Sequence, residues 1–336
     1  MTPFSSFLSL LDACILGDFE KAKQVFAVGG VNIHAEDDSA FVAACGHGHL
    51  AMAQWLLGLG GVDIHANDNG AFRWACARGH LVVAQWLLGL GGVDIHAEDD
   101  FAFRWACMKG HFVVAQWLVS LSGVGTHADV NAAFRGACHN GHLAVAQWVV
   151  SLDGVDIHTF EDAAFVWACA NGHVVVAQWL VSLGGVDIHV HNEHAFRRTC
   201  GCGHLVVAQW LVSLGVDVHA DNDHAFGWAC SNGHLVVAQW LFCLGGVDIH
   251  AREDFGFRWA CAHGHLQVAQ WLFDLGGVNM HARNDEAFKN ACRDGHLVVA
   301  RWLVALDSAW VWPLNSLKVL QAWSRPRDAW MRGVLQ

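Results

Sequence analysis

Residues 68–97 read DNGAFRWACARGHLVVAQWLLGLGGVDIHA, and this stretch contains the pattern that decides the fold. Apolar residues recur with helical spacing in two segments, first Phe72, Ala75 and Cys76, then Val83, Trp86, Leu87 and Leu90. Such stripes at i, i+3, i+4 and i+7 are typical of amphipathic helices that bury one face. Gly79 separates the segments, so the stretch predicts two short helices joined by a tight turn.

The same pattern recurs along almost the whole chain. The dipeptide Gly-His returns every 31 residues, apart from one step of 30 between Gly203 and Gly233. Its glycines are Gly48, Gly79, Gly110, Gly141, Gly172, Gly203, Gly233, Gly264 and Gly295, and Gly17-Asp18 fits the register one step earlier. A fixed period in this range is the signature of a solenoid, so the sequence predicts ten stacked helix pairs.

A polar residue marks the start of the first helix in each pair. Four residues after each histidine of the V-D-I-H type, eight of nine repeats carry Asp or Asn. The nine residues are Asp38, Asn69, Asp100, Asn131, Asp162, Glu193, Asp223, Asp254 and Asp285. Because Asp and Asn accept hydrogen bonds from free amides at a helix start, we expect these residues to be N-caps.

The segment A-C-x-x-G-H-L-x-V-A-Q-W-L, followed by G-V-D-I-H-A, resembles the ankyrin consensus A-A-x-x-G-H-L-x-V-V-x-L-L followed by G-A-D-V-N-A. The resemblance covers nearly all of residues 1–306 and implies an all-α, ankyrin-type helical solenoid of ten helix-turn-helix repeats. The stretch from the histidine to the first helix is three residues shorter than the usual ankyrin finger, so we expect short fingers. The pattern is similar to the short-period ankyrin proteins of giant viruses and protists.

Two domains are expected. Residues 1–306 form the solenoid, with its first and last repeats acting as caps, because a terminal repeat must present a polar outer face. The repeat register is lost in residues 307–336, where Pro313 and Pro326 limit the helices. We interpret this Trp-rich tail as a C-terminal helical cap or a docking element.

Composition argues against a nucleic-acid-binding protein and against a membrane-spanning protein. The formal net charge of −12 opposes binding to nucleic-acid backbones, and no apolar run reaches the length of a membrane span.

Ten of the twelve cysteines share one repeat position. Stacked helices lie about 8–10 Å apart, too far for disulfides. We therefore expect reduced thiols and a cytoplasmic location, in the host cytoplasm if the protein is viral.

Residues able to bind metal recur without forming a convincing site. Cys76 and His80 are spaced i, i+4, which can hold zinc on an unbroken helix, but Gly79 interrupts this one. We favour packing for the cysteines and backbone bonding for the histidines over metal ligation. The extra histidines His191, His194 and His224 are the one cluster that merits a metal test.

Tryptophans form two sets. One tryptophan recurs in every second helix after the first, and helical spacing assigns this set to the core: Trp55, Trp86, Trp117, Trp148, Trp179, Trp210, Trp240, Trp271 and Trp302. The second set, in the first helices, is Trp74, Trp105, Trp167, Trp228 and Trp259. Its position carries Ala, Gly, Arg or Asn in other repeats, which indicates partial exposure or packing between repeats.

A basic residue recurs in six of the first helices, at the position before that of the second tryptophan set: Arg73, Arg104, Arg135, Arg197, Arg258 and Lys289. Val42, Val166 and Gly227 interrupt this series. Either the basic residue binds an acidic partner or it forms local i, i+4 pairs with residues such as Asp100. The resemblance places these residues and those before each Gly-His on the concave face of the solenoid. The predicted protein-binding residues are Arg73, Trp74, Arg78, Arg104, Trp105, Lys109, Arg135, Trp167, Arg197, Trp228, Arg258 and Trp259.

These residues and the resemblance predict a non-enzymatic scaffold that binds partner proteins as a monomer, without cofactor or resident metal. The alternative is the substrate-recruiting arm of a ubiquitin-ligase adaptor that acts through residues 307–336. No unique nucleophile, general base or phosphate-binding loop stands outside the repeat, so we expect no catalytic site.

Overall fold

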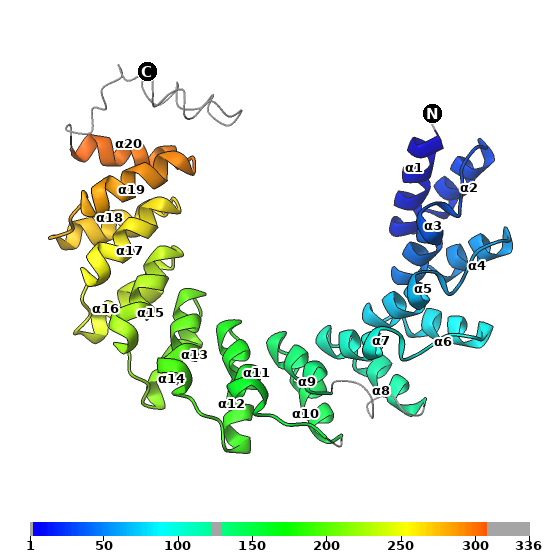
Figure 1. Ribbon diagram of the computed structural model, residues 1–336, viewed down its shortest axis with the longest axis horizontal. Coiled ribbons are helices and arrows are strands. Elements are labelled where there is room, and N and C mark those ends of the chain that lie inside the picture. The colour runs from blue at the N-terminus through cyan, green and yellow to red at the C-terminus, as the bar shows by residue number, and fades with distance from the viewer. Residues whose placement is uncertain (1–2, 122–129, 153, 308–336) are drawn as a thin grey trace. The chain divides into compact units, whose positions relative to one another are not determined.

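The computed structural model describes residues 3–121, 130–152 and 154–307, which contain twenty α-helices and no strand. The predicted all-α repeat fold is confirmed (Figure 1). The helices are α1 (Pro3–Leu16), α2 (Phe19–Ala27), α3 (Ala35–Gly46), α4 (Leu50–Gly58), α5 (Ala66–Ala77), α6 (Leu81–Leu90), α7 (Ala97–Met108), α8 (Phe112–Ser120), α9 (Val130–His139), α10 (Leu143–Val150), α11 (Thr159–Ala170), α12 (Val174–Leu183), α13 (Val190–Gly201), α14 (Leu205–Ser213), α15 (Ala220–Ser231), α16 (Leu235–Leu244), α17 (Ala251–Ala262), α18 (Leu266–Leu275), α19 (Ala282–Arg293) and α20 (Leu297–Leu306). Each odd-numbered helix and the helix after it form one repeat.

The chain divides into two compact units. The N-terminal unit comprises Met1–Ala168 and Val175–Val186, and the C-terminal unit comprises Cys169–Val174 and Asp187–Gln336. In the N-terminal unit, α1, α3, α5, α7 and α9 pack in succession, and in the C-terminal unit α13, α15, α17 and α19 do the same. Each unit therefore presents one surface built from first helices, called here its first-helix face.

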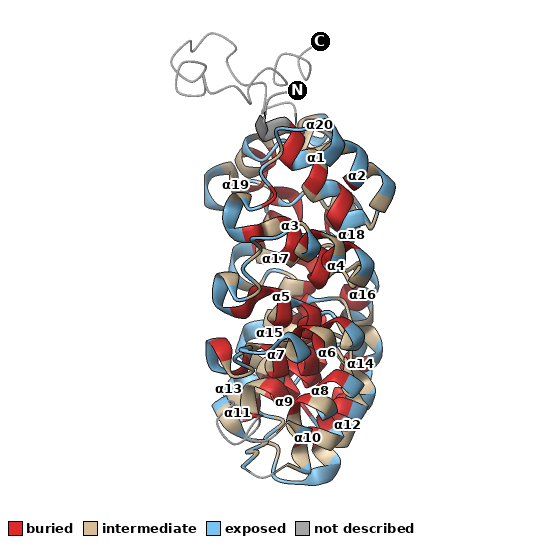
Figure 2. Ribbon diagram, turned by 90° about the vertical axis from the view of Figure 1, so that its right-hand side faces the viewer, coloured by how far each residue is buried: buried red, intermediate tan, exposed pale blue. Residues whose placement is uncertain are grey.

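The core follows the predicted stripes with two corrections. Phe72, Ala75 and Cys76 are buried in α5, and Val83 and Leu87 are buried in α6. Leu90, at the end of α6, is 42% exposed, because the helix ends there and no later turn covers it. In Figure 2 the buried positions lie on the helices, whereas most connecting turns are exposed.

The tryptophans of the second helices are the other correction, because all nine are half-buried rather than fully buried. Trp117 illustrates their role: its ring lies 6.2 Å from that of Phe72, which is buried in the preceding repeat. Phe41 and Trp86 repeat this arrangement at 6.3 Å. An indole is larger than the family's leucine, so one edge covers the neighbouring repeat while the other faces solvent.

The expected N-caps have a different role. In eight repeats, three consecutive residues within the first turn of the first helix adopt left-handed backbone angles, as do Asn67 (φ 54°), Asp68 (φ 51°) and Asn69 (φ 59°) in α5. This segment is called here the left-handed turn. Asp and Asn tolerate such angles better than other non-glycine residues, which explains why they recur.

The last residue of the left-handed turn joins adjacent repeats. The imidazole Nδ1 of His34 lies 2.7 Å from Oδ1 of Asp38, and the backbone N–H of Asp63 donates to Oδ2 of Asp38 at 3.0 Å. The same pair of contacts involves Asp254, through His250 at 2.7 Å and the N–H of Asn279 at 3.1 Å. These carboxylates therefore connect two repeats instead of serving only to cap a helix.

The Gly-His dipeptide also connects repeats. Gly79 has φ 84°, and a β-carbon at this position would lie 2.5 Å from Nδ1 of His111 in the next repeat. Nε2 of His49 lies 3.1 Å from the carbonyl oxygen of Ile15 in the preceding repeat, so its N–H can donate there. The histidine needs a glycine beneath its ring, which explains why the two residues recur as a pair.

No helix in the described ranges is long and apolar enough to cross a membrane. The predicted tail, residues 307–336, lies outside the described residues except for Asp307. Its assignment as a cap or docking element remains a prediction.

Candidate protein-binding surface

Four of the predicted arginines hold the left-handed turn of their own repeat. Nε of Arg73 donates to the carbonyl oxygen of Asp68 at 2.8 Å, and Nη2 donates to that of Asn67 at 2.7 Å. The guanidinium groups of Arg104, Arg197 and Arg258 bind the equivalent carbonyls of their own turns. Two donors in a fixed fork match two adjacent carbonyls, which a lysine does less well.

The structure differs from both interpretations of the recurring basic residues, which were partner binding and local i, i+4 pairing. Arg104 was expected either to face a partner or to pair with Asp100, yet it binds the backbone oxygens of Glu98 and Asp99. Arg258 is only 2% exposed and also forms an ion pair with Glu286. These guanidinium groups therefore have a structural role within the protein, whatever else the first-helix faces do.

Aromatic and cationic side chains gather on the first-helix face of the N-terminal unit. Trp74 is 37% exposed, and its ring centroid lies 5.5 Å from that of Phe101 and 6.4 Å from that of Trp105. The rings of Phe101 and Trp105 are stacked at 5.3 Å. Nζ of Lys109 lies 5.5 Å from the Trp105 centroid. The α5–α7 cluster is defined as Arg73, Trp74, Arg78, Phe101, Trp105 and Lys109.

Two further cations of this cluster lie over its rings. The guanidinium carbon of Arg78 is 5.3 Å from the Trp74 centroid, and that of Arg73 is 5.0 Å from the Phe101 centroid. Arg78 and Lys109 are exposed. Cations over aromatic faces keep the rings ordered while leaving positive charge at the surface. The cluster thus combines an apolar patch with a basic rim.

The C-terminal unit carries a related group on its own first-helix face. The imidazole of His224 lies 4.4 Å from the Trp228 ring, and Phe255 lies 6.0 Å from Trp259. The ring centroid of His263 lies 5.2 Å from that of Trp259. The α15–α17 cluster is defined as these five residues. It carries histidines where the α5–α7 cluster carries arginine and lysine.

Arg135 and Trp167 lie apart from these clusters, in α9 and α11 of the N-terminal unit. Arg135 donates to Oγ1 of Thr159 at 3.3 Å and lies 4.6 Å from the Phe160 centroid. Trp167 is 39% exposed, with His139 5.4 Å from its ring. The two residues therefore keep part of their surface accessible on the first-helix face.

Sequence reasoning missed Phe101 and Phe255. Each precedes a tryptophan by four residues, Trp105 or Trp259, so the two side chains are neighbours on one helix face. The position that they share holds Ser, Gly, Ala, His or Glu in the other repeats. An aromatic residue one turn before a variable tryptophan was the signal that could have revealed the clusters.

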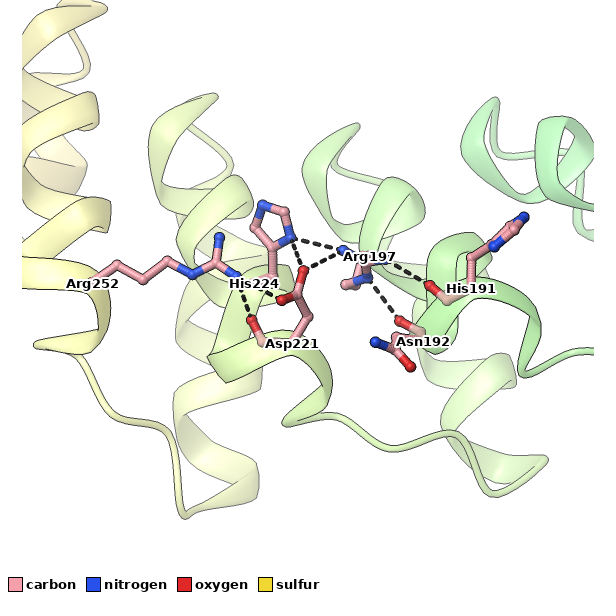
Figure 3. A network of polar contacts seen from close by, with 6 residues as sticks. All are labelled: His191, Asn192, Arg197, Asp221, His224 and Arg252. Atoms are coloured by element: carbon pink, nitrogen blue, oxygen red, sulfur yellow. Dashed lines mark hydrogen bonds and ion pairs between the residues drawn. The ribbon is translucent and has the colours of Figure 1, made fainter.

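A polar network crosses three repeats of the C-terminal unit (Figure 3). The carboxylate of Asp221 accepts from Nη1 of Arg197 and from Nη2 of Arg252, each at 2.7 Å. His224 Nδ1 lies 2.8 Å from the same carboxylate. Burial raises the pKa of Asp221, but the Arg252 guanidinium, the His224 imidazole and the Arg197 guanidinium together outweigh it and hold the pKa below its usual range.

The three histidines singled out for a metal test do not converge on one point. The rings of His191 and His194 are 6.3 Å apart, whereas His224 packs on Trp228 and Asp221. No group of three or more His, Cys, Asp or Glu in the described ranges is placed to hold a metal ion.

The cysteines behave as packing residues. Burial raises the pKa of the Cys14 and Cys138 thiols to about 12, and the other buried cysteines shift in the same direction. A thiol that resists ionisation is a poor nucleophile and a poor metal ligand. Cys202 and Cys243, the two cysteines outside the repeat position, are exposed.

Comparison with known families agrees with this architecture. A family model for ankyrin repeats (3 copies) matches residues 10–99 and 165–253, and one for ankyrin repeats (many copies) matches residues 257–304. A search of curated proteins gave no match. Ankyrin repeats generally mediate protein–protein interactions. With more than half of its residues matched and a paired-helix repeat throughout its described part, the chain belongs to the ankyrin-repeat family.

Proposed function

We propose that this protein is a non-enzymatic scaffold that binds partner proteins through its first-helix faces. The proposal includes a monomeric, cytoplasmic protein that needs no cofactor. The observation that carries it is the α5–α7 cluster, in which half-exposed Trp74 adjoins exposed Arg78 and Lys109. Tryptophan and arginine are the residues most enriched among the dominant contacts of protein interfaces.

The proposed anchors are the twelve residues predicted from sequence, with different contributions. Trp74, Arg78 and Lys109 provide accessible side-chain surface, and Trp105 supports them by stacking on Phe101. Arg73, Arg104, Arg197 and Arg258 act indirectly, because they fix the turns from which the face is built. Arg135, Trp167, Trp228 and Trp259 extend the surface within their own units.

The test compares partner capture from cell lysate by the immobilised wild-type protein and by a triple variant, Trp74→Ala, Arg78→Ala and Lys109→Ala. Arg104 and Arg258 are left unchanged, because removing a turn-holding guanidinium would disturb the fold as well as the surface. The matched control changes Val82, Gln85 and Val113 to Ala, which are exposed residues of α6 and α8. Circular dichroism verifies that all three proteins have equal helicity.

We expect the surface variant to lose at least tenfold in the amount of specific partner captured, and the control to retain it. Capture that falls in the control and persists in the surface variant would contradict the proposal and assign binding to the second helices. A second pair of substitutions, Trp228→Ala and Trp259→Ala, separates partners of the C-terminal unit from those of the N-terminal unit.

A further inference from the structure

Arg78 and Lys109 are exposed cations that pair with no carboxylate of the described residues. Exposed cations elsewhere have such partners, as Arg293 has in Asp294 at 2.9 Å. The chain holds 31 acidic and only 19 basic residues, so composition does not explain the missing partner. Two positive charges of one first-helix face are thus left without an internal counter-charge.

Contacts with the rings of the α5–α7 cluster hold both cations in place. The guanidinium carbon of Arg78 lies 5.3 Å from the Trp74 centroid, and its Nη1 donates to the carbonyl oxygen of Gly46 at 3.4 Å. Nζ of Lys109 lies 5.5 Å from the Trp105 centroid. A side chain that is already ordered loses less conformational entropy when it binds a ligand, so both cations are prepared for an anion.

The aromatic part of the cluster is two repeats wide. The position of Trp74 is occupied by Ala43 in α3 and by Gly136 in α9, so no indole continues the row on either side. Arg78 and Lys109 occupy equivalent positions of neighbouring helices, whose axes lie about 8–10 Å apart. An extended chain covers that distance in about three residues.

We propose that the α5–α7 cluster binds a short acidic segment of a partner protein, with two carboxylates about three residues apart and apolar side chains between them. Charge-assisted hydrogen bonds join the carboxylates to Arg78 and Lys109. The apolar side chains pack on the rings of Trp74, Phe101 and Trp105, which supply the desolvated centre of the contact. This inference rests on the proposed function and names the class of partner.

The surroundings of the cluster favour a short peptide over a nucleic acid. The left-handed turns of α5 and α7 carry the exposed acids Asp68, Glu98 and Asp99. The whole chain has a formal net charge of −12. A polyanion that extends beyond the cluster meets these negative charges, whereas a segment with two carboxylates does not.

The probe is the peptide acetyl-Gly-Glu-Phe-Leu-Glu-Gly-amide. One matched control carries Gln in place of both Glu residues, a second carries Lys, and a third carries Ser in place of Phe and Leu. A six-nucleotide oligothymidylate represents nucleic acid. Nuclear magnetic resonance titration of the full chain follows the indole N–H signals of Trp74 and Trp105. The acidic peptide should bind at least tenfold more tightly than each control peptide and the oligonucleotide.

A charge swap separates specific pairing from general packing. The variant Arg78→Glu with Lys109→Glu should bind the acidic peptide at least tenfold more weakly than the wild type and should bind the Lys peptide more tightly. The matched control variant, Lys23→Glu with Arg293→Glu, changes the net charge equally at exposed positions outside the cluster and should leave both affinities unchanged. Circular dichroism verifies equal helicity.

The inference is overturned if the wild type binds the Gln peptide or the oligonucleotide as tightly as the acidic peptide, or if it binds none of them. It is also overturned if the charge-swapped variant retains the acidic peptide. Partner capture that depends on Trp74, Arg78 and Lys109 would in those cases leave the scaffold proposal standing. Capture that does not depend on them would overturn the scaffold proposal itself.

Discussion

At the residue scale, the glycine of one repeat and the histidine of the next form one packing contact. The imidazole of a Gly-His dipeptide lies where a β-carbon of the preceding repeat's glycine would stand, as His111 does over Gly79 and His234 over Gly203. Both residues are therefore required by a single contact. The motif and its period could be predicted from the sequence. The contact could not, because the glycine and the histidine are about one repeat apart in the chain and only the stacking of repeats brings them together.

Gly79→Ala should destabilise the protein by about 2 kcal/mol or more, since it forces a left-handed alanine and displaces the His111 ring. Gly89 is the matched control, because it lies in α6 with open space around its α-carbon. Gly89→Ala should be neutral or stabilising by up to about 1 kcal/mol. Urea unfolding followed by circular dichroism measures both, and similar midpoints for the two variants would refute the Gly-His contact.

Thiol chemistry distinguishes the two classes of cysteine. Cys202 and Cys243 should react with an alkylating reagent in the native protein, whereas buried cysteines such as Cys76 should react only after unfolding. Burial raises the pKa of Cys292 to about 11, so this thiol should also react slowly. Mass spectrometry of protein labelled for short times at pH 7.5 gives the site of each modification. Rapid native labelling of Cys76 would be incompatible with the packed core.

At the element scale, the left-handed turn is the feature that periodicity could not reveal. Asp and Asn favour helix N-caps, but they also tolerate left-handed backbone angles, so composition alone leaves both structures possible. The guanidinium of Arg104, which binds two carbonyls of the turn, stabilises the left-handed form. The helix pairs themselves were predictable because apolar spacing reports directly which face is buried.

Arg104→Met should lower the free energy of unfolding by about 1–2 kcal/mol, because it keeps the apolar stem and removes both hydrogen bonds to the turn. The control Lys109→Met removes an exposed cation from the same first-helix face and should cost at most about 1 kcal/mol. Chemical denaturation of both variants provides the comparison. An equal or larger loss in the control would show that the turn does not need the guanidinium.

The clusters were predicted only in part, for a related reason. Variation at the position of Trp74 and Trp105 indicated partial exposure or packing between repeats, and the arginines one residue earlier were expected either to bind a partner or to form local i, i+4 pairs. Sequence spacing cannot distinguish a guanidinium that faces solvent from one that folds back on its own turn. The role of Phe101 could not be predicted from its own position, because it depends on stacking with Trp105.

At the scale of the whole molecule, the histidines link stability to pH. Burial is the main cause that lowers the pKa of five Gly-His histidines, His80, His111, His204, His234 and His265. In the unfolded chain these imidazoles titrate near pH 6.5, about their ordinary value. Folding therefore favours their neutral form, and the stability that they contribute is present above pH 6.5 and lost as the pH falls towards their folded pKa values.

His189 and His281 act in the opposite sense, because hydrogen bonds to carboxylates raise their pKa values. Their contribution is present below about pH 6.5 and lost as the pH rises through the folded pKa. Both are exposed, so solvent weakens their effect. The melting temperature should therefore fall when the pH is lowered from 7.5 to 5.5 at constant ionic strength. An unchanged or higher melting temperature at pH 5.5 would contradict this balance.

The two faces of each repeat can be compared by hydrogen–deuterium exchange of the N-terminal unit's helices in the full chain, with and without a partner recovered by capture. Binding through the first-helix face predicts slower exchange in α5 and α7, centred on Trp74 and Trp105, with little change in α6 and α8. Slower exchange confined to α6 and α8, with α5 and α7 unchanged, would contradict the proposed scaffold surface.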